Sequence, residues 1–212
     1  MTVQQSPTVV FDLGGVLVDW DPRYLYRKLL PDDEAVEKFL AEVTTPQWNR
    51  EQDAGRSWDE AVAVLSEQFP EHSELIAAYH HRWTEMISGQ IDGTVTTLRA
   101  LHEAGVPLYA LTNWSAEKFP YARDTFEWMS WFRGIVVSGA ERLVKPDPRI
   151  YHTLLDRYGV QASSAVYIDD SLPNVEAARV LGFTAIHFTG PDQLAADLAA
   201  VGLPVNGKEA SA

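Results

Sequence analysis

The chain has 212 residues, 46% hydrophobic and 22% charged, which predicts a soluble globular protein of one domain or one domain with an insertion. It contains no cysteine, and this excludes disulfides, zinc–thiolate sites, iron–sulfur sites and a cysteine nucleophile. A formal net charge of −13 predicts repulsion from DNA and RNA, so no nucleic-acid partner is expected. The first seven residues lack the pattern of a secretory signal, and no apolar run approaches the ~20 residues of a membrane span. We therefore expect a cytoplasmic protein without a membrane partner.

Short apolar runs rich in β-branched residues predict a set of strands. Each run is nearly continuous, which is typical of strands that are buried on both faces of a parallel sheet. Amphipathic stretches between the later runs predict helices that stop at Gly105, Gly159 and Gly182. This alternation predicts a doubly wound parallel α/β sheet. The predicted strands span residues 8–11, 107–111, 134–137, 165–168 and 184–188.

Residues 22 to about 90 interrupt this alternation with helical periodicity and without a convincing strand. The interruption predicts an all-helical insertion after the first strand, so the core is expected to span 1–20 and 91–204, and the inserted domain 21–90. The small, polar residues 205–212 predict a disordered tail. The helices predicted within the insertion span residues 23–30, 32–43, 58–69 and 73–88.

Polar residues follow four of the predicted strands at their carboxyl ends, where open α/β sheets bind ligands. Three clustered carboxylates repel one another unless a cation separates them, and Mg²⁺ prefers oxygen ligands. One Mg²⁺ and one lysine would bring such a cluster close to neutrality, so a phosphoryl group is not excluded, and one carboxylate can then act as a nucleophile. The residues at these strand ends are Asp12, then Thr112 and Asn113, then Lys145 in a loop, then Asp169 and Asp170.

Four motifs that occur in this order resemble those of the haloacid dehalogenase (HAD) superfamily, over nearly the whole chain. The resemblance implies a Rossmann-like core sheet with an α-helical cap, as in the first subclass of that family, inserted between the first and second motifs. The motifs are FDLGGVL at 11–17, LTN at 111–113, VKPDP at 144–148 and IDDSLPN at 168–174.

The resemblance also implies roles for individual residues. Asp12 is expected to attack phosphorus, Thr112 to hydrogen-bond the transferring group, and Lys145 to neutralise charge and anchor the nucleophile. Asp170 is expected to bind Mg²⁺ together with Asp169, with Asp12 and the carbonyl of Gly14 as further ligands. Substrate contacts are expected from Asn113, Gly14, Gly15 and Trp114, and Trp20 and Trp48 are the other tryptophans expected near the substrate.

One position departs from the pattern of the family. Most phosphatases of the superfamily carry a second aspartate two residues after the nucleophile, as general acid and base, but here that position is Gly14. General acid–base catalysis contributes about 10²–10⁴-fold, so its loss matters for a poor leaving group. Three explanations remain open: another acid approaches (Asp19 is the nearest carboxylate in sequence), the substrate has a good leaving group such as a sugar 1-phosphate, or the chemistry differs.

The leading hypothesis is a Mg²⁺-dependent phosphatase that acts on a small phosphorylated metabolite through an aspartyl-phosphate on Asp12. The alternative is a metal-independent 2-haloacid dehalogenase, in which Asp12 attacks carbon and the halide leaves without a proton. The pair Asp169–Asp170 favours the phosphatase. A third hypothesis is a non-catalytic module that binds a phosphometabolite. We expect a small-molecule substrate and either a monomer or a homodimer.

Overall fold

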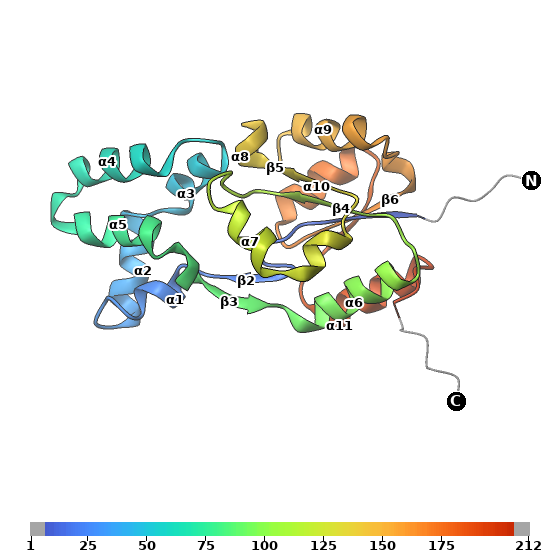
Figure 1. Ribbon diagram of the computed structural model, residues 1–212, viewed down its shortest axis with the longest axis horizontal. Coiled ribbons are helices and arrows are strands. Elements are labelled where there is room, and N and C mark those ends of the chain that lie inside the picture. The colour runs from blue at the N-terminus through green and yellow to red at the C-terminus, as the bar shows by residue number, and fades with distance from the viewer. Residues whose placement is uncertain (1–6, 206–212) are drawn as a thin grey trace, which may run out of the picture.

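The computed structural model describes residues 7–205, so the predicted tail lies, except for Val205, outside the described residues. Its central sheet is parallel throughout, with the strand order β5-β4-β1-β6-β7 (Figure 1). This confirms the predicted doubly wound α/β sheet. The strands are β1 (Thr8–Phe11), β4 (Leu108–Thr112), β5 (Gly134–Val137), β6 (Ala165–Asp169) and β7 (Thr184–His187).

The continuous apolar pattern of the strands follows from burial on both faces. In β1, Val9 and Phe11 belong to one hydrophobic cluster, while Val10 belongs to a second cluster on the opposite face. Helices α6 (Asp92–Glu103) and α11 (Pro191–Ala200) cover the first face (Figure 1). Helices α9 (Pro148–Tyr158) and α10 (Leu172–Val180) cover the second. Because alternate side chains enter two cores, no strand residue needs to be polar.

The three predicted helix stops are confirmed. Gly105, Gly159 and Gly182 follow α6, α9 and α10 with φ angles of 76°, 65° and 93°. These angles lie in the left-handed region, which glycine adopts without steric cost. Each stop turns the chain back toward the next strand of the sheet.

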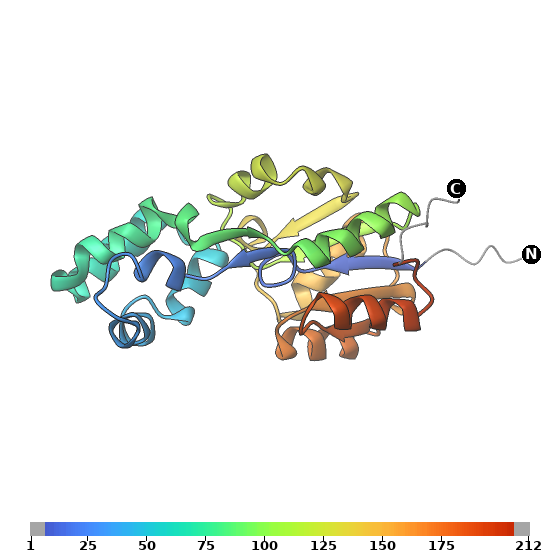
Figure 2. The ribbon, with the colours of Figure 1, turned by 90° about the horizontal axis from the view of Figure 1, so that it is seen from below.

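A group of helices extends to one side of the sheet (Figures 1 and 2). Three of these helices begin at a side-chain cap: Asp32 accepts a hydrogen bond from the backbone N–H of Ala35 (2.8 Å), and Thr45 and Ser57 cap the next two in the same way. Such caps satisfy backbone donors that the first turn leaves free. No helix within residues 7–205 has the length and apolar character to cross a membrane. The helices of this group are α1 (Arg23–Tyr26), α2 (Asp33–Glu42), α3 (Pro46–Asp53), α4 (Trp58–Gln68) and α5 (Ser73–His81).

Short helical segments complete the chain. Helices α7 (Phe119–Thr125) and α8 (Ser138–Glu141) come after β4 and β5 in the chain. The 3₁₀ turns are η1 (Pro70–His72), η2 (Trp83–Met86), η3 (Glu127–Trp131) and η4 (Ala162–Ser164).

The expectation of an insertion without strands is wrong at its end. Strand β3 (Ile87–Gln90) pairs antiparallel with β2 (Val18–Trp20), and the helix predicted to reach Ser88 stops at His81. The strand is short and contains Gly89, so its local sequence carries a weak strand signal. Its hydrogen-bond partners come from a distant part of the sequence. The two chain crossings between the sheet and the helical group therefore run through one β-ribbon.

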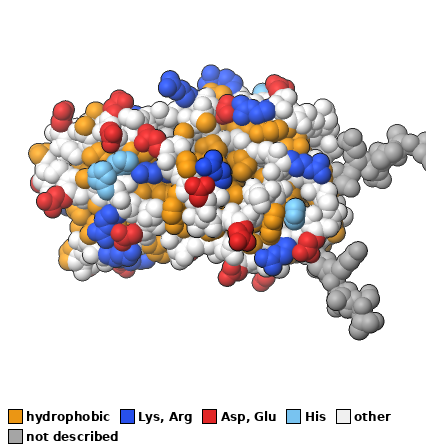
Figure 3. Space-filling model, viewed as in Figure 1, with side chains coloured by type: hydrophobic (Ala, Val, Ile, Leu, Met, Phe, Trp, Pro, Cys, Tyr) orange, Lys and Arg blue, Asp and Glu red, His pale blue; other side chains and the backbone are white. Residues whose placement is uncertain are grey.

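Surface charges and the charges at the sheet edge have different surroundings. On the face in Figure 3, basic and acidic side chains lie interspersed. Solvent-exposed ion pairs also occur, such as Arg23 with Glu37 (2.6 Å). By contrast, Lys145 and Asp169 at the carboxyl edge of the sheet are completely buried. Buried charges require specific partners, and clusters of them are typical of functional sites, so this edge is a candidate functional site.

Candidate active site

The carboxyl edge of the sheet brings together the residues that follow its three central strands. Asp12 follows β1, where its N–H donates to the carbonyl of Ile168 (2.8 Å) and its Oδ1 accepts from the N–H of Leu13 (2.7 Å). Because β1 lies between β4 and β6, the residues after those strands are its neighbours. Carboxylate oxygens of Asp12, Asp169 and Asp170 lie within 4.8 Å of one another. The structure therefore brings the three predicted carboxylates into one cluster.

Lys145 lies at the centre of this cluster. Its ammonium donates to the carbonyl of Leu111 (2.9 Å) and to Asp169 Oδ2 (2.6 Å), and it lies 2.9 Å from Asp12 Oδ2. These three acceptors match the three N–H donors of an ammonium group. Asn113 holds the lysine backbone from both sides, since its Oδ1 accepts from the Lys145 N–H (2.8 Å) and its Nδ2 donates to the Lys145 carbonyl (3.2 Å). The amide of Asn113, predicted to contact substrate, thus positions Lys145.

Asp169 is the most heavily hydrogen-bonded carboxylate of the cluster. Besides Lys145, it accepts hydrogen bonds from the Tyr167 hydroxyl (2.5 Å), the Ser171 N–H (2.8 Å) and the Asn174 amide (3.0 Å). Burial opposes its ionisation, but the Lys145 ammonium and these hydrogen bonds outweigh burial and lower its pKa below the ordinary value. Asp169 is therefore a charged anchor for Lys145, with little freedom to move.

The pKa values of the other two carboxylates, Asp12 and Asp170, are raised above the ordinary value. Burial, together with the negative charges of Asp169 and Asp170, raises the pKa of Asp12 to about 8 against the influence of Lys145. Burial and Asp169 also raise the pKa of Asp170. One ammonium cannot balance three carboxylates, so the ionised cluster carries an excess of negative charge. This all-oxygen donor set fits a divalent cation such as Mg²⁺, which would favour ionisation of Asp12 and Asp170.

The two glycines that follow Asp12 and Leu13 have different surroundings. Gly15 has a φ of 73°, and a Cβ atom built there would lie 2.3 Å from Asp170 Oδ2, so a larger residue would displace that carboxylate. A Cβ atom at Gly14 would meet open space. Gly15, predicted to contact substrate, thus makes room for Asp170, while Gly14 faces a cavity.

Thr112 ends β4 at the same edge, and its side chain is fully buried. Its hydroxyl has no hydrogen-bond partner within the described chain. A buried hydroxyl without a partner costs about 1–3 kcal/mol, so such a group needs a reason to be there. An oxygen atom of a bound substrate would provide the missing partner, which agrees with the role expected for Thr112.

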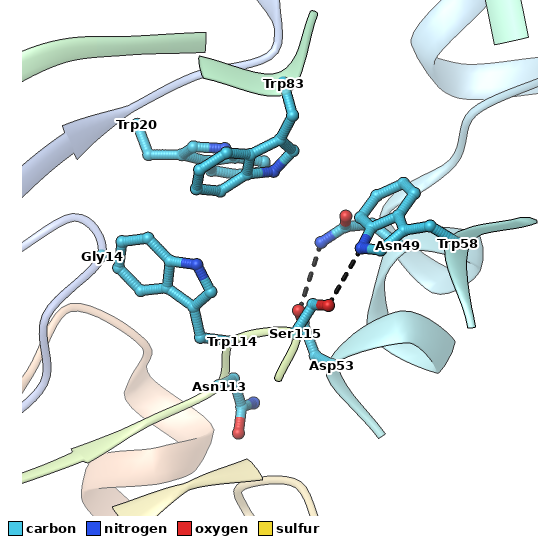
Figure 4. Close-up of a pocket in the computed structure, with 9 residues that line it drawn as sticks. All are labelled: Gly14, Trp20, Asn49, Asp53, Trp58, Trp83, Asn113, Trp114 and Ser115. Atoms are coloured by element: carbon cyan, nitrogen blue, oxygen red, sulfur yellow. Dashed lines mark hydrogen bonds between the residues drawn. The ribbon is translucent and has the colours of Figure 1, made fainter. Parts of the chain in front are cut away.

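A cavity of about 70 Å³ opens beside these residues, between the sheet edge and the helical group (Figure 4). Its wall includes the predicted residues Trp20 and Trp114, whose indole N–H groups are buried without a partner within residues 7–205. Trp48, also expected near the substrate, lies behind the wall, where it packs against Trp58 at 5.7 Å between ring centroids. The lining residues are Gly14, Trp20, Asn49, Asp53, Trp58, Trp83, Asn113, Trp114 and Ser115.

Two polar residues of this wall, Asn49 and Asp53, were not expected from the sequence. Both lie on α3, a helix that the hydrophobic pattern does not predict, although Thr45 followed by Pro46 is a typical helix start. The Asn49 amide donates to Asp53 Oδ2 (3.2 Å; Figure 4). Burial raises the pKa of Asp53 to about 7, against the opposing influence of a Ser115 backbone hydrogen bond, Arg50 and Lys145. The helix start at Thr45 and Pro46 could have located α3, but the position of Asp53 in the cavity wall depends on contacts with the core.

Comparison with known proteins agrees with this geometry. Residues 7–182 match the family model described as haloacid dehalogenase-like hydrolase. A sesquiterpene phosphatase of Aspergillus oryzae is 31% identical, over 85% of this chain and 88% of the relative. A phosphoglycolate phosphatase of Photobacterium profundum is 25% identical, over 81% of this chain and 78% of the relative. The solved structure of a HAD family enzyme from Bacteroides thetaiotaomicron, as a magnesium complex, matches with a TM-score of 0.68 and 18% identity, over 88% of this chain and 95% of that one.

The chain belongs to the haloacid dehalogenase-like hydrolases. It is a HAD-type enzyme, and its phosphatase relatives support assignment as a phosphoric monoester hydrolase. The four sequence motifs thus identified the family correctly.

Proposed function

We propose that the protein is a Mg²⁺-dependent phosphatase of a small phosphorylated metabolite, with Asp12 as the nucleophile. The observation that carries this proposal is the cluster of three carboxylates around the buried ammonium of Lys145. The ammonium fixes Asp12 Oδ2 in place, and the unpartnered hydroxyl of Thr112 offers a hydrogen bond to a phosphoryl oxygen. Phosphoryl transfer depends mainly on such positioning and charge neutralisation.

Asp12, Asp170 and the carbonyl of Gly14 are the groups that would hold Mg²⁺, with Asp169 beside them. The bound ion would neutralise charge on the phosphoryl group. Among residues 7–205, the Asp170 carboxylate makes no ion pair or hydrogen bond with another side chain, so it is free to act as a ligand, whereas Asp169 is held by four donors. We therefore assign direct coordination to Asp170 and an anchoring role to Asp169.

The cavity supports a small substrate. A volume of about 70 Å³ accommodates a compact organic group next to the phosphoryl site, and four tryptophans supply flat apolar walls. The free indole N–H groups of Trp20 and Trp114 offer hydrogen bonds to oxygen atoms of that group. A hydroxylated metabolite such as a sugar 1-phosphate has both features, and its leaving group suits a site with glycine at position 14. We propose that the helical group, residues 21–90, acts as the cap that selects this substrate.

Hydrolysis of 4-nitrophenyl phosphate with and without Mg²⁺ tests the proposal. We expect metal-dependent turnover that falls by at least about 10³-fold in Asp12→Asn, since an amide cannot form the phosphoryl ester. Asp124→Asn, on an exposed helix, is the matched control and should retain full activity. Turnover that is independent of metal, or that survives in Asp12→Asn, would contradict the proposal.

The two other hypotheses give different results in the same experiment. A 2-haloacid dehalogenase would release chloride from 2-chloropropionate without added metal and would leave the phosphate ester intact. A module that only binds phosphometabolites would bind Mg²⁺ and inorganic phosphate in calorimetry without turnover of either substrate. The excess negative charge of the cluster disfavours the dehalogenase, because a metal-independent enzyme has no bound cation to offset that charge when an anionic substrate binds.

A further inference from the structure

Resting on the proposed phosphatase function, we propose that Asp53, on the cap helix α3, is the general acid that replaces the aspartate missing at position 14. The site lacks a proton donor next to the nucleophile, because Gly14 has no side chain. Asp53 lines the same cavity as Gly14, which lies two residues after Asp12, and Asn113, which directly follows Thr112. Figure 4 shows Asp53 and Asn49 approaching the cavity from the side opposite Gly14. A leaving group bound between them would lie within reach of this carboxyl group.

The backbone around Asp53 is tied to the core, so its position next to the sheet edge is defined. The Ser138 hydroxyl, at the end of β5, donates to the Asp53 carbonyl (2.6 Å) and accepts from the N–H of Trp114 (2.9 Å). On the next helix, the Trp58 indole donates to the Ser115 hydroxyl (2.9 Å). These hydrogen bonds link the cap segment that carries Asp53 directly to the segment after β4.

The environment of Asp53 suits a group that carries a proton near neutral pH. Asp53 is half-buried in the cavity wall. The loss of solvent around its carboxyl group disfavours the ionised form, and this effect outweighs a Ser115 backbone hydrogen bond and two cations, Arg50 on its own helix and Lys145 from the core. The Tyr79 hydroxyl on α5 is the other titratable group nearby, and its pKa lies well above the ordinary value because of burial. A general acid works best when its pKa lies near the operating pH.

The proposed hydrolysis proceeds in two steps. In the first step an Asp12 oxygen forms a bond to phosphorus, the bond from phosphorus to the ester oxygen breaks, and Asp53 gives its proton to that oxygen, which leaves as an alcohol. In the second step water attacks phosphorus and gives a proton to the Asp53 carboxylate, the bond between Asp12 and phosphorus breaks, and inorganic phosphate leaves. Both carboxyl groups return to their initial states.

Two substrates of similar shape test this role. Phenyl phosphate and 4-nitrophenyl phosphate differ mainly in the acidity of the phenol that leaves, and only the less acidic phenol needs protonation. We expect Asp53→Asn to slow phenol release in the first turnover about 10²-fold for phenyl phosphate and less than about 3-fold for 4-nitrophenyl phosphate. A rate measured in the first turnover reports only the release of phenol, because phosphate is released from Asp12 in a later step. In the unmodified enzyme, only the phenyl phosphate rate should decline above about pH 7.

Two further variants sharpen the test. Asp19→Asn removes the rival carboxylate, which is hydrogen-bonded to the Tyr24 hydroxyl (3.0 Å) and is not part of the cavity wall, and it should leave the ratio of the two rates unchanged. Gly14→Asp, where a side chain meets open space, should restore phenyl phosphate turnover to Asp53→Asn. Equal losses on both substrates, no loss on either, or selective loss in Asp19→Asn would overturn the role of Asp53. Failure of the unmodified enzyme to release either phenol would instead refute the phosphatase function, and the role of Asp53 with it.

Discussion

The carboxyl edge of the sheet and the cavity beside it differ in how their polar groups are satisfied. At the edge, the charged groups of Lys145 and Asp169 contact protein partners on nearly every side. In the cavity wall, two indole N–H groups have no partner within the described residues. Satisfied groups are held rigidly, while unsatisfied ones are available to a ligand. We infer that the edge fixes the chemistry and that the cavity selects what is bound.

The largest expected effect is a loss of stability when the buried lysine at the carboxyl edge of the sheet is replaced. Replacing Lys145 by Met leaves Asp12 and Asp169 buried without their shared cation, so the free energy of unfolding at neutral pH should fall by about 3–5 kcal/mol. Urea denaturation measures this loss. Lys28→Met, which removes an exposed pair with Glu85 (2.9 Å), is the matched control and should cost about 0–1 kcal/mol. A Lys145 variant as stable as this control would show that the edge is not the rigid region we describe.

Thr112 is the exception at the edge, because its hydroxyl is unsatisfied. Thr112→Val keeps the shape and removes only this hydroxyl, so we expect the protein to become more stable, by up to about 1–3 kcal/mol, while kcat falls about 10–100-fold. Thermal denaturation and hydrolysis of 4-nitrophenyl phosphate measure the two effects. Thr97→Val, on α6 with a hydroxyl bonded to the Gly93 carbonyl (3.3 Å), controls for the same substitution in a satisfied site. A parallel loss of stability and activity in Thr112→Val would assign Thr112 to structure.

The smallest expected effect lies in the cavity and appears as a pH dependence of stability. Because the pKa of Asp53 rises from 3.8 to about 7 on folding, the folded protein keeps a proton between these values that the unfolded chain has lost. The free energy of unfolding therefore decreases as pH rises through this window. Asp53→Asn should be more stable than the unmodified protein at pH 8, with a smaller gain at pH 4. A difference in Tm that does not change with pH would show that Asp53 ionises normally.

The sequence predicted the sheet well because each strand carries its own signal. Val9, Val10 and Phe11 form a continuous apolar run, and burial on both faces explains all three. The sequence pattern did not predict the strand Ile87–Gln90, since the stability of that strand comes from its pairing with Val18–Trp20. Pairing between distant segments leaves little trace in a local pattern.

The distinction between local sequence signals and contacts of distant segments also applies to the candidate site. The residues proposed for catalysis lie at or directly after the ends of strands, so strand prediction alone locates Asp12, Thr112 and Asp169. Asp53 is brought to the cavity by the packing of α3 against the core, through the Ser138 hydroxyl, and no motif marks that contact. Sequence motifs therefore specify the chemistry of this enzyme more completely than they specify its cavity.

The β-ribbon of β2 and β3 has a mechanical consequence. Both crossings between the sheet and the cap are hydrogen-bonded to each other, with Val18 opposite Gln90 and Trp20 opposite Ile87. We infer that neither crossing bends without the other, so that a movement of residues 21–90 relative to the sheet would be a hinge motion about this ribbon. A single proteolytic cut in one crossing would leave the cap attached through the other. Trp20 belongs both to the ribbon and to the cavity wall, so a swing at this hinge would change the shape of the cavity.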